Sequence, residues 1–143
     1  MVARARAVVD EAVARPPALH LRHVALIVAD LEAVERFYVD VFGMSVEWRP
    51  DPDNVYLRGQ ADNLALHRAP AGATPGAGAL DHYGFVVASP GDVDAWAEHL
   101  RAAGVVLAAE PKTHRDGARS LYLNDPAGTL VQILFHPPIS PTL

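Results

Sequence analysis

An internal repeat constrains the fold of this chain more than any other feature of its sequence. A shift of 59 positions places Leu21–Ala29 (LRHVALIVA) on Leu80–Ala88 (LDHYGFVVA), with Leu, His, Val and Ala identical at four positions. The same shift aligns apolar positions further along: Val34 with Val93, Phe37 with Trp96 and Val41 with Leu100. One register that aligns a strand-like run and the amphipathic run after it predicts two copies of one structural unit.

Each half of the repeat predicts a βαβββ unit. A short run rich in β-branched and aromatic residues comes first, and an amphipathic helix with apolar residues three and four positions apart follows it. Three further strands complete each half, at 44–49, 54–58 and 63–68, then at 105–108, 119–124 and 129–135. We therefore expect an α+β fold whose tandem βαβββ modules form a curved, cup-shaped mixed sheet, with the helices on the outer face.

Both halves have residues suited to helix ends on either side of the predicted helix. Asp30 is a candidate N-cap for the first helix, and Ser89 or Asp92 for the second. Gly43 and Gly104 stand where a helix C-terminus favours a residue that tolerates positive φ. The expected organisation is an N-terminal helical extension (1–19), a first module (20–69), a Pro/Gly/Ala linker (70–79), a second module (80–136) and a proline-rich tail (137–143).

Composition excludes several classes of function. The net charge of −5 and the scatter of 12 Lys and Arg argue against a nucleic-acid surface, which needs clustered cations. The chain has no cysteine, which excludes disulfides and thiolate chemistry and fits a reducing compartment. No window approaches the ~20 apolar residues that cross a bilayer. Charges at Arg4, Arg6 and Asp10 are unlike a secretory signal, so we expect a cytoplasmic protein without membrane contact.

Strand alternation places two histidines and one glutamine on a common surface. If Val24, Leu26 and Val28 pack on the first helix, then His23 points to the opposite face of its strand. The same alternation puts His82 and Gln132 opposite the second helix. Ala25 and Gly84 share this surface and leave room beside it. The pattern indicates a concave site for a small molecule.

These features resemble the vicinal oxygen chelate superfamily, which includes glyoxalase I, methylmalonyl-CoA epimerase, extradiol dioxygenases, fosfomycin-resistance transferases and bleomycin-resistance proteins. The resemblance covers about residues 20–136. It rests on the two strand-start histidines, on the repeat, and on the closing segment Tyr122–Gln132 (YLNDPAGTLVQ). It is specific for the fold and only weakly specific for the reaction.

The resemblance implies a divalent metal in the cup, held by His23, His82 and Gln132, with Fe(II), Mn(II), Ni(II) or Zn(II) as the ion. The last ligand in the family is usually Glu, four residues after the Gly of Asp-Pro-x-Gly, and this chain has the neutral amide of Gln132 there. A neutral carbonyl is a weaker donor than a carboxylate, so the expected metal affinity is lower. Leu66 holds the place of a fourth ligand that some members have, and His67 is expected to point to the other face.

Within the family, the sequence motifs of this chain are most similar to those of the extradiol dioxygenases. The segments Asn63–Leu66 and His114–Gly117 carry this likeness. By resemblance, Tyr122 and His114 line the substrate site, although the spacing from His114 to Tyr122 is one residue short. Those enzymes usually have histidines where this chain has Ala61-Asp62, one of them acting as an acid/base. This departure and Gln132 argue against ring cleavage.

Two main classes of function follow from the sequence. The first is a metal-dependent dioxygenase, lyase or isomerase that acts on a small oxygen-rich or aromatic molecule, with Tyr122 donating a hydrogen bond or proton. The second is a metal-free protein that binds a small molecule or sequesters a drug, in which the two histidines persist without a metal. A purely structural role is a third alternative. The resemblance also implies a homodimer.

Overall fold

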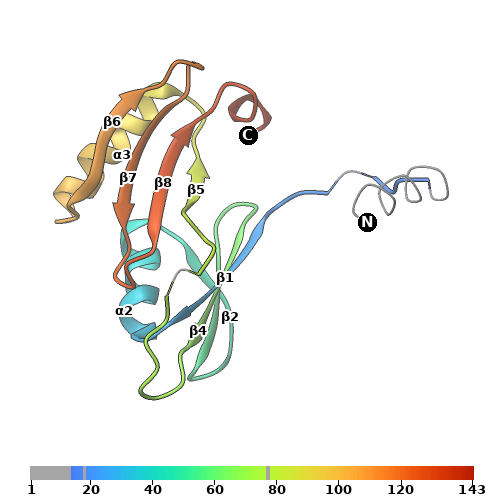
Figure 1. The fold of residues 1–143 in the computed structure, drawn as a ribbon, viewed down its shortest axis with the longest axis vertical. Helices are drawn as coiled ribbons and strands as arrows, with labels where there is room; N and C mark the ends of the chain where they lie inside the picture. The colour runs from blue at the N-terminus through green and yellow to red at the C-terminus, as the bar shows by residue number, and fades with distance from the viewer. Residues whose placement is uncertain (1–13, 18, 77) are drawn as a thin grey trace.

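The computed structural model describes residues 14–17, 19–76 and 78–143. Most of the predicted N-terminal helical extension lies outside these residues. Elsewhere the order of elements follows the repeat, with one βαβββ unit in each half (Figure 1). None of the helices in the described part of the chain is long and apolar enough to span a membrane.

The first half forms a four-stranded mixed sheet, sheet A. Its elements are β1 (His23–Val28), α2 (Leu31–Arg36), the π-helical turn η1 (Phe37–Val41), β2 (Ser45–Asp51), β3 (Asn54–Arg58) and β4 (Asn63–Arg68). The strand order is β1-β4-β3-β2, with β1 parallel to β4 and the other pairs antiparallel. The parallel pair requires a crossover, and α2 with η1 lies within it.

The second half repeats this topology in sheet B. Its elements are β5 (Tyr83–Val86), α3 (Pro90–Ala102), β6 (Leu107–Thr113), β7 (Arg119–Asn124) and β8 (Leu130–Phe135), in the order β5-β8-β7-β6. A 3₁₀ turn (Ser140–Thr142) follows β8 outside the sheet. The prediction of an α+β fold from tandem βαβββ units is confirmed. The eight strands form two separate four-stranded sheets.

The residues predicted to cap the two helices do so in the structure. The Asp30 carboxylate accepts a hydrogen bond from the backbone N–H of Ala33 at 3.0 Å. Ser89 and Asp92 form a reciprocal capping box at the start of α3. Gly43 and Gly104 have φ values of 75° and 80°, which only glycine adopts without strain.

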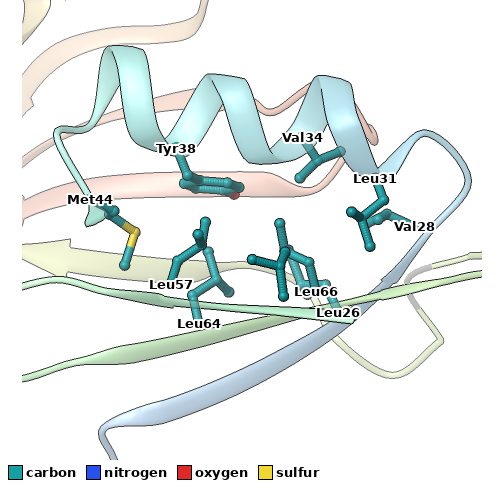
Figure 2. Packing of buried hydrophobic residues seen from close by; sticks show 10 residues of the cluster. Leu26, Val28, Leu31, Val34, Tyr38, Met44, Leu57, Leu64 and Leu66 are labelled. Atoms are coloured by element: carbon teal, nitrogen blue, oxygen red, sulfur yellow. The ribbon is translucent and has the colours of Figure 1, made fainter. Parts of the chain in front are cut away.

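Each sheet packs one face against its own helix. In the first half, Leu31, Val34 and Tyr38 point from the helical segment onto the sheet (Figure 2). They meet buried side chains from β1, β3 and β4: Leu26, Val28, Val55, Leu57, Leu64 and Leu66. The second core has the same plan, with Val93, Ala97 and Leu100 of α3 on Leu121, Leu123, Val131 and Ile133. Alternate residues of every central strand therefore point away from the helices.

The two cores meet at a seam between the modules. Phe37, Phe42, Tyr83 and Phe85 pack against both clusters. The rings of Phe42 and Phe85 are 5.1 Å apart, centroid to centroid. Tyr83 and Phe85 of β5 pack on the first core as well as on the second, because α2 lies between sheet A and one end of sheet B (Figure 1). The helix-facing sides are thus joined within one chain.

Candidate functional site

The faces turned away from the helices carry the predicted site residues. On sheet A this open face includes His23, Ala25 and Ile27 of β1, all exposed, while Val28 beside them is buried. On sheet B the open face includes His82, Gly84, Tyr122 and Gln132, on the side opposite the buried residues Leu121, Leu123, Val131 and Ile133. The predicted facing of His23, His82 and Gln132 is confirmed, and each lies on its sheet's open face.

A chain of hydrogen bonds holds the imidazole of His23. The Asn63 side chain stands directly across from His23 in the β1–β4 register. Its Nδ2 donates to Oε2 of Glu47 at 2.5 Å, so its Oδ1 is left to accept from Nδ1 of His23 at 2.6 Å. This arrangement fixes the tautomer of His23 with the proton on Nδ1. The lone pair on Nε2 is available for a ligand.

His82 is held in a similar way on sheet B. Its Nδ1 lies 2.6 Å from Oδ2 of Asp81, a carboxylate that can only accept. The ring of His82 meets the ring of Tyr122 edge to face at 5.3 Å between centroids. Nε2 of His82 makes no hydrogen bond with the described residues. Among the described residues, each of the two repeat histidines thus has Nδ1 bonded to an oxygen and no hydrogen bond at Nε2.

Gln132 lies beside His82 on the same face. It pairs with Gly84 on one side and with Tyr122 on the other in the sheet register. A Cβ at position 84 would lie 3.4 Å from the Cβ of Gln132 and 3.5 Å from its Oε1. The absent side chain of Gly84 therefore leaves space against the amide of Gln132. His82, Tyr122 and Gln132 form one cluster, the sheet B cluster.

The structure places His114 at the margin of this cluster. Its Nε2 lies 3.0 Å from the hydroxyl of Ser120, which is buried at 2% exposure. Ser120 and Tyr122 are two residues apart on β7 and so share a face. No hydrogen bond or ring contact among the described residues joins His114 to Tyr122 or His82. His114 is close in the sheet but not part of the cluster.

The fourth strand corrects one expectation. Leu66 is fully buried in the first core, on the helix-facing side, so it cannot stand in the place of a ligand. His67 instead lies on the open face, opposite Ile27 in the register. Its Nδ1 lies 2.6 Å from Oδ1 of Asn54, and its ring packs edge-on against Tyr56. Four residues along β4 separate His67 from the position opposite His23.

An aromatic wall on sheet A could not be placed from the sequence. Trp48 and Tyr56 stack with centroids 5.2 Å apart, and Trp48 is 59% exposed. Both residues share the open face with the small residues Ala25 and Ala65, which occupy the next two positions across the sheet. The wall therefore stands beside a shallow area next to His23.

The donors of one chain do not gather into a metal site by themselves. The described residues include no group of three or more His, Asp or Glu side chains that could hold an ion. His23 makes its contact within sheet A, whereas His82 and Gln132 lie on sheet B. The chemistry of the donors nevertheless fits a divalent transition metal, because imidazole Nε2 with Nδ1 bonded to an oxygen is the usual form of a ligating histidine.

A hollow of about 340 Å³ lies at the seam, apart from these residues. Its apolar wall includes Phe42, Phe85 and Trp96, and its polar rim includes Arg58 and Asp62. The rings of Phe42 and Trp96 stack at 5.5 Å. The guanidinium of Arg58 makes no hydrogen bond or ion pair with the described residues. Neither His23 nor any member of the sheet B cluster lines this hollow.

Comparison with solved structures supports the fold. A lactoylglutathione lyase from Agrobacterium tumefaciens is 25% identical, with a TM-score of 0.71, and the match covers 87% of this chain and 98% of that one. A glyoxalase-related enzyme from Fulvimarina pelagi is 25% identical, with a TM-score of 0.66 over 84% and 90% of the two chains. An integron cassette protein from the Halifax Harbour sewage outfall metagenome shares the fold at 22% identity and a TM-score of 0.70, over 82% and 98%.

A comparison with sequence models of protein families identifies the family of the chain. The model of the Glyoxalase/Bleomycin resistance protein/Dioxygenase superfamily matches residues 20–133, which span both sheets and every member of the sheet B cluster. The duplicated βαβββ topology and the paired histidines are consistent with this match. The chain belongs to the Glyoxalase/Bleomycin resistance protein/Dioxygenase superfamily.

Proposed function

We propose that this protein is a metal-dependent enzyme acting on a small oxygen-rich or aromatic molecule, with His23, His82 and Gln132 holding a divalent ion. One observation carries the proposal. Both repeat histidines stand on open faces with Nδ1 bonded to an oxygen, and Nε2 of each has no hydrogen bond to the part of the chain that the structure describes. His67 has the same hydrogen bond but no counterpart in the repeat, and it lies four residues along its strand from the row of His23.

Two imidazoles and one amide oxygen suit Fe(II), Mn(II), Ni(II) or Zn(II). When bound, such an ion polarises oxygen atoms of a substrate as a Lewis acid. The side chains of this chain have the other tasks. Asn63 and Asp81 orient the two imidazoles, and the hydroxyl of Tyr122, beside His82, donates a hydrogen bond to oxygen that gains negative charge. His114 is the second candidate for moving a proton, through Ser120.

A homodimer is the assembly that we propose for this site. Two apolar side chains on the open face of sheet A, Ile27 and Trp48, are 61% and 59% exposed. Leu19 and Leu21, in the segment before β1, are 95% and 92% exposed. Because the helix-facing sides already meet within one chain, a second copy can cover these surfaces by bringing its sheet B against sheet A. The complete site would then combine His23 of one copy with His82 and Gln132 of the other.

Metal content tests the proposal directly. Protein purified without chelator is expected to hold one transition-metal ion per site, measured by elemental analysis and titration. His82→Ala should weaken metal binding about 10–100-fold or more, since it removes a ligand rather than an outer partner. His67→Ala is the control, because it removes an imidazole with the same Nδ1–oxygen contact from the open face of sheet A, and His67 is not a proposed ligand. Equal affinities in wild type and His82→Ala would overturn the assignment.

Gln132 needs a separate test because its donor is weak. Gln132→Ala should lower the affinity and Gln132→Glu should raise it, since a carboxylate adds negative charge at the ion. If Gln132→Ala binds metal as wild type does while His82→Ala does not, Gln132 is not a ligand.

The hollow at the seam supports a second candidate, a metal-free protein that binds a small molecule. Its volume is within the ordinary range for ligand sites, and its aromatic walls stand beside Arg58, whose guanidinium has no partner among the described residues. Asp62, on the same rim, lies 3.9 Å from Arg22, which offsets its charge. An apolar anion is the fitting occupant. We would titrate 8-anilinonaphthalene-1-sulfonate into chelator-treated protein and follow its fluorescence. Arg58→Ala should weaken binding about tenfold, as expected for one charged hydrogen bond, while Trp48→Ala on the open face should leave it unchanged.

A further inference from the structure

Three side chains form a buried polar network across the seam. Tyr38 of η1 is fully buried, and its hydroxyl donates to Oδ2 of Asp125 at 2.7 Å. The hydroxyl of Tyr83, at the start of β5, is hydrogen-bonded to the hydroxyl of Tyr38. Asp125 is 4% exposed, and its Oδ1 accepts from two backbone N–H groups in the turn between β7 and β8, those of Ala127 and Thr129, at 2.9 Å each.

The direction of these hydrogen bonds follows from the number of protons. The single proton of Tyr38 goes to the Asp125 carboxylate, so the Tyr83 hydroxyl must donate to the Tyr38 oxygen. Burial is the main cause that raises the pKa of Tyr38 and of Tyr83 above the ordinary value of a phenol, which keeps both hydroxyls protonated as donors. The network therefore runs one way, from Tyr83 through Tyr38 to Asp125.

The network ends beside two of the proposed ligands. Tyr83 is the residue after His82, and it pairs with Val131, the residue before Gln132. The Asp125 turn leads directly into β8. Tyr38, in contrast, belongs to the first module. The three side chains thus connect the helix of one module to the two strand ends that carry His82 and Gln132.

The repeat shows that this network is not a copied element of the fold. Under the shift of 59, Tyr38 corresponds to Ala97 and Tyr83 to Val24. Neither counterpart has a hydroxyl, so the second helix cannot make an equivalent contact. A buried network present once in a duplicated fold connects the modules and is not required by either βαβββ unit.

We infer that Tyr38, Tyr83 and Asp125 are positioning residues: they hold the second module on the first so that His82 and Gln132 keep their place and orientation at the site. The effect on metal affinity that this inference predicts rests on the proposed function. The effect on the ring resonances of His82 does not, because it is measured without metal.

Tyr83→Phe is the principal test, because it removes one hydroxyl of a partly buried residue and keeps the ring. We expect the tautomer-sensitive ring ¹⁵N resonances of His82 to change in the metal-free protein, while those of His67, which has the same Nδ1–oxygen bond on the first module, stay the same. Metal affinity should fall about tenfold, the lower end of the effect of losing an outer partner. Tyr38→Phe should produce the same pattern more strongly.

Three outcomes are distinguishable. Unchanged His82 resonances in a folded Tyr83→Phe protein would overturn the inference, even if the midpoint of unfolding falls, because the network would then only stabilise. A wild type that binds no metal would refute the proposed function and leave the resonance test in force. If Tyr38→Phe does not fold, Tyr83→Phe still decides, since the bond from Tyr38 to Asp125 remains in that variant.

Discussion

The seam between the modules and the open faces of the sheets are built in opposite ways. At the seam, aromatic rings pack on both cores, and each hydroxyl and carboxylate of the network has a partner within the chain. On the open faces, large apolar side chains remain exposed, and two imidazoles each have one nitrogen without a hydrogen bond to residues 14–17, 19–76 or 78–143. The seam is complete in one chain and the open faces are not. From this contrast we expect the cores and the seam to determine stability, and the open faces to bind the proposed metal.

Neighbouring positions on the β1–β4 pair, Leu66 in the first core and Ile27 on the open face, test the expected difference in packing. Leu66→Ala empties a fully buried site and should cost about 2–5 kcal/mol of the free energy of unfolding. Ile27→Ala, on the open face, should cost less than about 0.5 kcal/mol in the monomer. Denaturant unfolding at low protein concentration measures both. Similar losses would show that the open face is packed like the core. A loss for Ile27→Ala that appears only at high concentration would indicate burial by a second copy.

Gly84→Ala should separate stability from binding. The added methyl group makes ordinary contacts of 3.4–3.5 Å with Gln132, so the fold accommodates it. The loss of glycine's freedom in the unfolded chain should stabilise the protein by about 0.4–1 kcal/mol. The same methyl group fills the space beside Oε1 of Gln132 and should weaken metal binding. Thermal unfolding and metal titration on the same preparation check both signs. Unchanged affinity would place the ion away from Gln132.

The smallest expected effect concerns an exposed ion pair on the helix-facing side. The hydrogen bond from Arg68 lowers the pKa of Glu32 from 4.5 to about 2. A lowered carboxyl pKa stabilises the folded state above the unfolded value, and this contribution is lost as the pH falls from 4.5 through about 2. Glu32→Gln should therefore be less stable than wild type at neutral pH, and the difference should shrink below pH 4.5 and disappear only below about pH 2. A difference that persists in acid, or that salt does not reduce, would contradict this origin.

Much of the fold could be predicted because the hydrophobic alternation is strong. The bounds of β3, β4 and β7 agree with the predicted segments to the residue. The edge strands β2 and β6 were harder to predict, since they contain register irregularities and no buried residue. Strand β6 was expected at 105–108 and spans Leu107–Thr113. Without alternation, neither its extent nor the facing of its side chains can be read from the sequence.

The two histidines of the site could be predicted from the sequence, but the residues that hydrogen-bond to His23 could not. The repeat singled out His23 and His82, but nothing local in the sequence links His23 to Asn63 and Glu47, which come from β4 and β2. The family resemblance put Leu66 in the place of a ligand, whereas strand alternation would have placed it in the core. The Tyr38–Asp125 bond joins residues 87 positions apart, and the only sequence signal was the Asp-Pro-Ala-Gly segment itself.

Mixing two inactive variants tests the central claim that the site forms from His23 of one copy and His82 of another. His23→Ala and His82→Ala chains are unfolded together, refolded, and assayed for bound metal against each variant alone. Shared sites predict recovery of about one quarter of the wild-type metal, because half of the dimers are mixed and each of those has one complete site of two. No recovery from a mixture of folded dimers, with metal bound by wild type, would place both histidines of a site in the same chain.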